Sequence, residues 1–318
     1  MVMSGFSLSR RTIVTAASAL CVPMRPSAAA HAPPLDDRMQ AFWPVYEDAR
    51  DAALADRVAR LQTEYFERQA SVYARACMRR ISSEGIASWL AKFDAMSVQV
   101  RAVHARLARE FAAHVGRFTS AFGDFDAALS PVFVLPSLFR FDAHLEPDGT
   151  SLPLFFGPDG IVRYHGADAD LGVLLAHEIF HCYQGQKNPA MALDPKPPLF
   201  AGVWMEGCAT YASERLNPGA SPRQVLLDDE SLERDGPKFA ARAARSLLER
   251  LDSRDDEDQR AYLSLGFKGE WPDRIGYLLG LWAARRIGQR MSLQEMVALP
   301  APAVRSELVK ALSDIARS

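Results

Sequence analysis

The segment His177-Glu178-Ile179-Phe180-His181 is the clearest starting point in this sequence. Apolar residues recur around it at helical spacing and predict a helix over residues 168–184. Two histidines four residues apart on a helix are separated by about 40° around the axis and about 6 Å along it, so both rings project from one face. This separation suits two ligands of one tetrahedral zinc ion.

Glu178 lies about 100° around the same helix from His177, which makes it a poor third ligand but places it within reach of a water on the open side of the metal. The order His-Glu-x-x-His therefore separates two metal ligands, His177 and His181, from one general base. The alternative is a helix that carries two histidines on its surface or satisfied in the core.

A catalytic zinc ion needs a third protein ligand, and Glu206 is the best candidate because it comes near the start of the next predicted helix. Gly207 and Ala209 are small, and we expect them to let that helix approach the histidine helix. Asp194, in a proline-rich connection, and Glu214, two turns later, fit less well. A further alternative is that Glu206 interacts only with the dipole of its own helix.

The residues around these ligands resemble the gluzincin clan of zinc metallopeptidases. The matching pattern is His177–His181 followed by Trp204-x-Glu206-Gly207-x-Ala209-x-Tyr211. More narrowly, the chain resembles uncharacterised bacterial families of predicted zinc-dependent proteases, which carry a segment similar to Pro272-x-Arg274-x-Gly276-Tyr277-x-x-Gly280 after the zinc site. The motifs span about residues 168–282.

The resemblance implies a role for each matching residue. His177, His181 and Glu206 would bind Zn²⁺, and Glu178 would activate a zinc-bound water that attacks a peptide bond. Tyr277 would stabilise the oxyanion that forms, although an aromatic ring that merely packs on a helix face is an equal alternative.

Two departures from better-known gluzincins matter. Met205 precedes Glu206 and Thr210 follows it where thermolysin-like enzymes have Asn and Asp, and the Gly-x-Met-Glu-Asn motif of aminopeptidases is absent from the sequence. The surroundings of the ligands and the substrate specificity are therefore left unassigned.

The fold class that the sequence predicts is α+β and mostly helical. Short β-prone runs at residues 131–135, 151–156 and 160–164 precede the histidine helix, with residues 157–160 read as a turn between two of them. The resemblance implies that this sheet and the active-site helix form a zincin-like core at residues 129–217. Helical regions are predicted on either side, at residues 33–128 and 218–318.

The two flanking regions show helical periodicity. Residues 35–122 are predicted to be helical with a break at residues 82–85, where Ser83 is available as an N-cap. Later helices are predicted at residues 203–216, 239–251 and 275–287, with capping signals at Ser221-Pro222 and Ser292–Glu295 and a solvated charged stretch at residues 252–260. We expect His165 in the loop that enters the histidine helix and Asp170 in the first turn of that helix.

The first residues have the pattern of an export signal. Ser9-Arg10-Arg11 precedes a weakly apolar stretch and then small residues, which resembles a twin-arginine signal over residues 1–32 that is cut near Ala30 or Ala32. This predicts a periplasmic or secreted protein. The alternative, a buried N-terminal helix, is disfavoured by Pro23 and Pro26.

Composition narrows the classes of function. The 318 residues are 48% hydrophobic, and 37 Lys and Arg against 39 Asp and Glu leave no basic excess for nucleic acid. No apolar run is long enough to span a membrane. Of the four cysteines, Cys182 and Cys208 flank the proposed ligands, so a disulfide between them is one alternative in an oxidising compartment.

The sequence therefore predicts an exported zinc metallopeptidase that acts on a peptide or protein substrate. Two alternatives stay open: a zinc-dependent hydrolase of a non-peptide bond, such as a cell-wall amide, and a zinc-binding protein without catalysis. The sequence assigns neither the cleavage specificity nor the oligomeric state.

Overall fold

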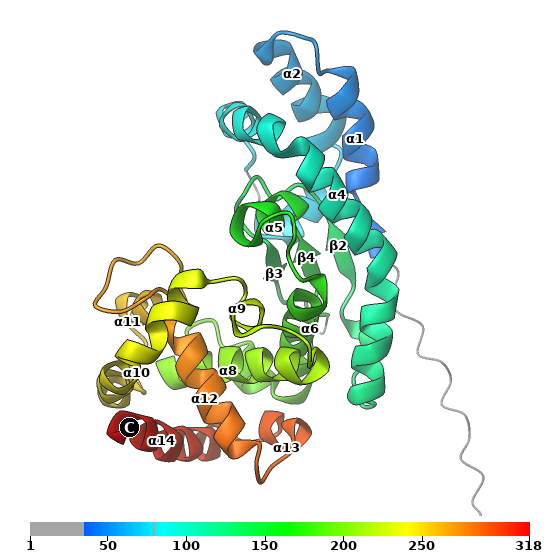
Figure 1. Ribbon diagram of the computed structural model, residues 1–318. Coiled ribbons are helices and arrows are strands. Elements are labelled where there is room, and N and C mark those ends of the chain that lie inside the picture. Colours follow the sequence, from blue (N-terminus) through cyan, green and yellow to red (C-terminus); the bar gives the residue numbers. More distant parts are fainter. Residues whose placement is uncertain (1–34, 79, 150) are drawn as a thin grey trace, which may run out of the picture. The chain divides into compact units, whose positions relative to one another are not determined.

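Helices make up most of the fold, and they surround a four-stranded mixed sheet (Figure 1). The computed structural model describes residues 35–78, 80–149 and 151–318. The predicted α+β, mostly helical class is confirmed. The predicted export signal at residues 1–32 lies outside the described residues. Among the helices that the structure does describe, none combines the length and apolar character needed to cross a membrane.

The sheet has the order β1-β2-β4-β3. Strands β1 (Leu35–Asp37), β2 (Val132–Val134) and β4 (Leu154–Phe156) run parallel, whereas β3 (Ala143–Leu145) pairs with β4 in the antiparallel sense and forms one edge. Strands β2 and β4 are buried and lie within two of the three predicted β-prone runs, but β1 and β3 were not predicted. Strand β3 is half-exposed and presents its free edge to the site described below.

One of the predicted strands is wrong. Residues 158–165 form helix α5 (Pro158–His165), and residues 157–160, read as a turn, begin it. Gly157 is the N-cap and Pro158 takes the first helical position, where the missing N–H of proline costs no hydrogen bond. A Gly-Pro pair is typical both of turns and of helix N-termini, and in this chain it begins helix α5.

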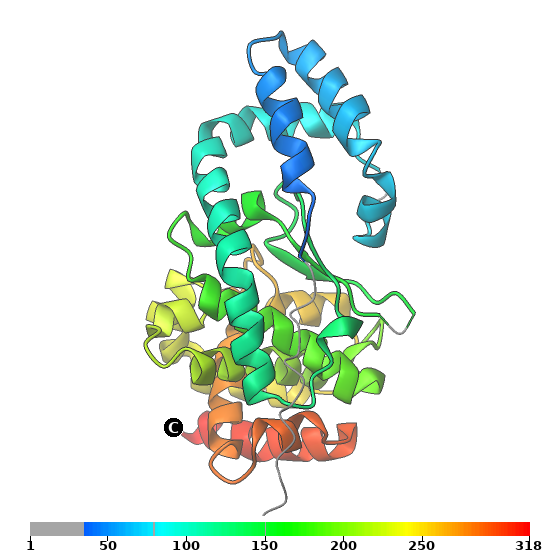
Figure 2. The same cartoon turned by 90° about the vertical axis from the view of Figure 1, so that its right-hand side faces the viewer.

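A long helix, α4 (Ser83–Ala121), connects the N-terminal helices to the sheet. It contacts β1, α5 and α6, and Figure 2 shows it running beside the strands. Its N-cap is Ser82, which accepts from the Gly85 N–H, so the prediction of Ser83 was wrong by one residue. The shorter helices before it are α1 (Met39–Asp48), α2 (Leu54–Arg60), the π-helix η1 (Leu61–Phe66) and α3 (Ala70–Arg75).

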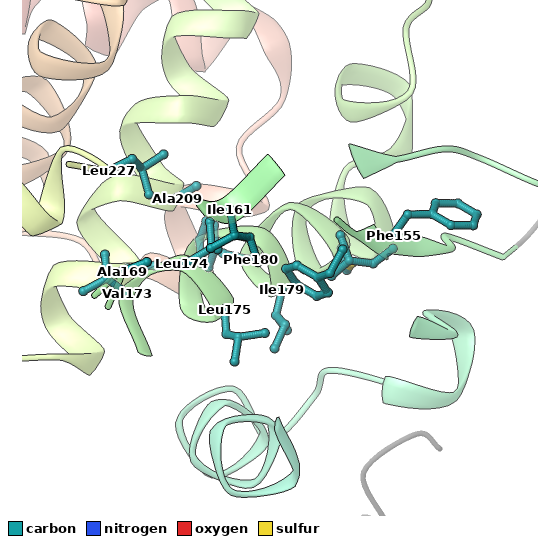
Figure 3. Packing of buried hydrophobic residues seen from close by; sticks show 14 of the residues in the cluster. Phe155, Ile161, Ala169, Val173, Leu174, Leu175, Ile179, Phe180, Ala209 and Leu227 are labelled. Atoms are coloured by element: carbon teal, nitrogen blue, oxygen red, sulfur yellow. The ribbon is translucent and has the colours of Figure 1, made fainter. Parts of the chain in front are cut away.

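Three helices carry the candidate site: α6 (Leu171–Lys187), α8 (Leu199–Leu216) and α12 (Ile275–Ile287). Helix α8 packs against both α6 and α12. Asp170, predicted in the first turn of this helix, is instead the N-cap of α6 and accepts from the Gly172 and Val173 N–H groups. Apolar side chains of α6 pack with those of β4, α5 and α8 in one buried cluster (Figure 3).

The role predicted for Gly207 needs correction. A Cβ at Gly207 would collide with the backbone of Gly280, so this glycine allows α8 to approach α12 rather than the histidine helix. Ala209 is fully buried in the core cluster (Figure 3). The close glycine contact matters for the site because it sets α12 directly against the helix that carries Glu206.

The C-terminal part is helical, as predicted, with both capping boxes present at Ser221 and Ser292. Helix α11 begins within the charged stretch at residues 252–260, and Asp255 is its N-cap. The remaining helices are η2 (Ala127–Leu129), α7 (Pro189–Ala192), α9 (Pro222–Val225), α10 (Glu230–Arg250), α11 (Asp256–Leu263), α13 (Leu293–Val297) and α14 (Ala301–Arg317).

Candidate metal centre

Three ligand atoms from two helices converge at one point. His177 Nε2 lies 3.1 Å from His181 Nε2 and 3.2 Å from Glu206 Oε2, and His181 Nε2 lies 3.3 Å from the same oxygen. The two histidines come from α6 and the glutamate from the middle of α8. These three residues form a group that could hold a metal ion. The convergence predicted from the sequence is therefore present.

The triangle of ligand atoms suits a small tetrahedral ion. Zinc takes nitrogen and oxygen ligands at about 2.0–2.1 Å, and a tetrahedral arrangement then separates neighbouring ligands by about 3.3 Å. The three observed separations, 3.1, 3.2 and 3.3 Å, are close to that value. Two imidazoles and one carboxylate are also a donor set found in catalytic zinc sites with an open fourth position.

A side chain behind the site fixes the orientation of His181. The Gln184 amide oxygen lies 2.8 Å from His181 Nδ1, and the Gln184 amide nitrogen donates to the Met205 carbonyl at 3.0 Å. Because an amide oxygen can only accept, Nδ1 must carry the proton, which in the neutral ring leaves Nε2 as a lone pair toward Glu206. Gln184 was not predicted, although its position three residues after His181 places it on the same helix face.

His177 is held by packing. It is buried, its ring stacks on that of Tyr277 with centroids 6.0 Å apart and planes 6° from parallel, and its Nδ1 atom has no hydrogen-bond partner among the described residues. A buried polar atom without a partner costs free energy. Coordination of Nε2 offers a reason to keep a histidine here rather than an apolar side chain.

The electrostatics of the three residues are coupled. Burial lowers the pKa of His181, but the neighbouring Glu206 carboxylate outweighs this and raises it to about 9. Burial lowers the pKa of His177 as well, and there it prevails over the attraction of Glu206. For Glu206 itself, the two imidazoles overcome burial and hold the pKa far below its usual range. The Glu206 carboxylate is therefore negatively charged and attracts positive charge to this point.

Glu178 faces a cavity beside these ligands. The cavity has a volume of about 580 Å³ and is lined by Glu178, His181, Glu206 and Tyr277, and by residues of strand β3. Burial raises the pKa of the Glu178 carboxyl group to about 8. Within the part of the chain that the structure describes, no group hydrogen-bonds this carboxyl. Glu178 is therefore free to interact with a molecule in the cavity.

Tyr277 lies at the site, as predicted, and a charged pair supports it. The Arg274 guanidinium is 5.4 Å from the centre of the Tyr277 ring and donates to Asp229 at 3.1 Å. Arg274 itself has a left-handed backbone (φ 55°) as the N-cap of α12. Burial and the nearby Glu206 carboxylate raise the pKa of the Tyr277 phenol well above 10, so the hydroxyl keeps its proton.

The other acids weighed as third ligands do not take part. Asp194 pairs with Arg254 at 2.9 Å, and Glu214 pairs with Arg285. The two cysteines near the site, Cys182 and Cys208, are buried thiols that no disulfide joins. Burial raises the pKa of the Cys182 thiol to about 12, which keeps it protonated.

His165 is not in an exposed loop. It is the last residue of α5 and its side chain is buried, with Nε2 2.6 Å from Asp142 and Nδ1 3.1 Å from the Leu227 carbonyl and 3.6 Å from Asp228. Asp142 lines the cavity, so His165 supports the cavity wall. The sequence did not predict this cluster, because the groups around His165 come from two segments that are distant from it in the chain, at Asp142 and at residues 227–228.

No protein-family model, no curated protein and no solved structure matches this chain. The site is therefore characterised by its own residues and geometry.

Proposed function

We propose that this protein is a zinc-dependent metallopeptidase that hydrolyses peptide bonds. The observation that carries the proposal is the convergence of His177, His181 and Glu206 within 3.3 Å, beside a cavity into which Glu178 projects. The resemblance of these segments to gluzincins supports it, and so does the position of α6 beside a small mixed sheet, as in a zincin-like core. The twin-arginine-like pattern supports export.

The residues divide the chemical work. His177, His181 and Glu206 would hold the zinc ion, which when bound supplies a Lewis acid that polarises the scissile carbonyl and lowers the pKa of water. Burial raises the pKa of Glu178 to about 8, and a bound cation beside it would favour the ionised form. The Glu178 carboxylate would then accept a proton from the attacking water and pass it to the leaving amine. Glu178 suits this role because it faces the cavity and no described protein group occupies its oxygens.

Tyr277 supplies a hydrogen bond to negative charge that develops on the substrate. Its phenol stays protonated because burial raises its pKa well above 10, so the hydroxyl can donate at neutral pH. The Arg274 guanidinium over its ring and the stacked His177 ring fix its orientation.

Strand β3 favours a peptide as the substrate over a small ester. This edge strand lines the cavity, and one of its sides has no strand partner among the described residues. An extended peptide can add to such an edge through main-chain hydrogen bonds, with alternate side chains facing the protein. The scissile bond would then lie across the cavity, beside Glu178.

Glu178→Gln tests the proposal. The amide cannot accept the proton, and general acid–base catalysis is worth about 10²–10⁴ in rate, so we expect kcat on a cleavable peptide to fall by about that factor. Elemental analysis of the same preparation should still find about one zinc per chain, because Glu178 is not a ligand. The wild-type protein loaded with zinc is the control. Turnover equal to that of the wild type would show that Glu178 is not the base.

Tyr277→Phe tests the second assignment. It removes the hydroxyl and keeps the ring that stacks on His177. We expect kcat to fall about tenfold, with the zinc content and the melting temperature unchanged. A fall in zinc content together with kcat would instead assign Tyr277 a packing role.

A further inference from the structure

Three cations line a depression that adjoins the catalytic cavity. Lys92, Arg140 and Arg163 are exposed, and within the described residues none of them lies within 4 Å of a carboxylate. Other arginines of the described chain, such as Arg57, Arg274 and Arg305, are neutralised by a carboxylate. The depression has a volume of about 200 Å³. It has room for a small anionic group, not for an extended polyanion.

The loop that carries Arg140 is strained and rigid. Leu138 and Phe139 both have left-handed backbones (φ 55° and 59°), which side chains with a Cβ rarely adopt. The fully buried Asp159 holds them there: its carboxylate accepts from Ser137 N–H at 2.7 Å and from Phe139 N–H at 2.9 Å. Such backbone conformations persist only where the surrounding structure enforces them, and they cluster at functional sites.

The neighbouring cation is also held in place. The Arg163 guanidinium lies over the ring of Phe139, 5.4 Å from its centre, and 5.7 Å from the centre of the Tyr164 ring. Trp89 donates to the same Asp159 carboxylate at 3.0 Å, from the helix that carries Lys92. One buried acid therefore links the segments that present all three cations.

Arg140 borders both the depression and the catalytic cavity. It precedes strand β3 (Ala143–Leu145) by three residues, so a peptide that pairs along the free edge of β3 passes Arg140 as it leaves the strand. A strand rises about 3.3 Å per residue, which puts Arg140 a few residues of substrate away from β3.

We propose that Arg140, with Lys92 and Arg163, binds a carboxylate of the peptide substrate several residues from the scissile bond. The planar guanidinium fork of arginine matches a carboxylate in shape and charge. The carboxylate comes from an Asp or Glu side chain or from the C-terminus of the peptide. This inference rests on the proposed peptidase function.

The test is a library of synthetic peptides of about 12 residues, each with a free or an amidated C-terminus, cleaved by the zinc-loaded wild-type protein and analysed by mass spectrometry. We expect Asp and Glu to be enriched at one fixed position if a side chain binds. Loss of cleavage on amidation, at a fixed distance from the C-terminus, identifies the terminal carboxylate instead.

Variants then test the cations. Arg140→Ala should lower the ratio of kcat/KM for an acidic peptide to that for its neutral counterpart by about fivefold to tenfold. The double variant Arg140→Glu with Arg163→Glu should invert the preference toward Lys and Arg. The control is Arg109→Ala, an exposed arginine that pairs with Glu110, and it should keep the wild-type ratio. Because both substrates are compared in one preparation, a loss of folded protein cancels.

Cleavage without a preference for a carboxylate, or a preference that survives Arg140→Ala, would overturn this inference and leave the peptidase intact. Failure of the zinc-loaded wild type to cleave any peptide would overturn the proposed function and this inference with it.

Discussion

Two histidine–carboxylate clusters flank the cavity lined by Glu178, and the ring nitrogens of their histidines have different partners. In the His165 cluster, Nε2 faces Asp142 and Nδ1 faces the Leu227 carbonyl, so an imidazolium at His165 has an acceptor for each N–H. In the other cluster, the Nε2 atoms of His177 and His181 and the Glu206 oxygen face one another. The first cluster satisfies both ring nitrogens with protein groups alone, whereas in the second both Nε2 atoms face the same Glu206 oxygen, in a group that could hold a metal ion.

The two clusters differ in how the protein compensates the charge of a buried histidine. His165 neutralises the charge of Asp142 from within the chain, and its pKa is raised to about 9: burial lowers it, but Asp142 and Asp228 outweigh burial. In the second cluster the Gln184 amide oxygen accepts from His181 Nδ1–H, so Nε2 is the ring atom directed at Glu206. A cation at that point would satisfy all three atoms together.

The largest expected difference between the two clusters is in zinc affinity, and the substitution Glu206→Ala tests it. Structural zinc binding is worth about 10–16 kcal/mol, so one of three protein ligands is worth roughly 3–5 kcal/mol, and we expect zinc affinity to fall by about two to four orders of magnitude. Competition with a chelator of known affinity measures it. The matched variant Asp142→Ala, at the other cluster, should leave zinc affinity within about threefold of the wild type.

The second effect concerns His165→Asn and its dependence on pH. The pKa of His165 is raised from 6.5 in the unfolded chain to about 9 in the folded protein, so its charge stabilises the fold fully below about pH 6.5. That contribution, about 3 kcal/mol, is lost as the pH rises through about 9. Urea unfolding of both proteins between pH 6 and pH 10 should show the difference shrinking. A difference that stays constant over this range would contradict the charged state of His165.

A smaller effect is expected from Gln184→Leu. The leucine leaves His181 Nδ1 without an acceptor, and loss of such an outer partner costs about 10–100-fold in metal affinity. Gln184→Glu keeps an acceptor for His181 and should recover most of the affinity. Equal affinities for the two variants would mean that Gln184 acts only by packing.

The convergence of His177, His181 and Glu206 was predictable because it depends mostly on local geometry. The spacing of His177 and His181 on one helix fixes their separation, and Glu206 required only one further helix at close range. The helix capped at Ser292 and the helix at residues 275–287 were predicted for the same reason, because capping signals and hydrophobic periodicity depend on residues that are close in the sequence.

What the sequence did not predict depends on distant contacts. Strand β3 has no strong β propensity and exists because it pairs with β4. Helix α5 replaces a predicted strand, since its buried Asp159 bonds to the loop at residues 137–139. Gly207 was assigned to the wrong interface because only the fold reveals that Gly280 lies opposite.

The metal content of the wild-type chain, purified under native conditions and measured by inductively coupled plasma mass spectrometry beside His181→Ala, tests the central claim most directly. We predict about one zinc per wild-type chain and a large loss in the variant. A wild-type chain that holds no divalent metal, even after incubation with zinc and removal of the excess, would contradict the assignment of His177, His181 and Glu206 as ligands.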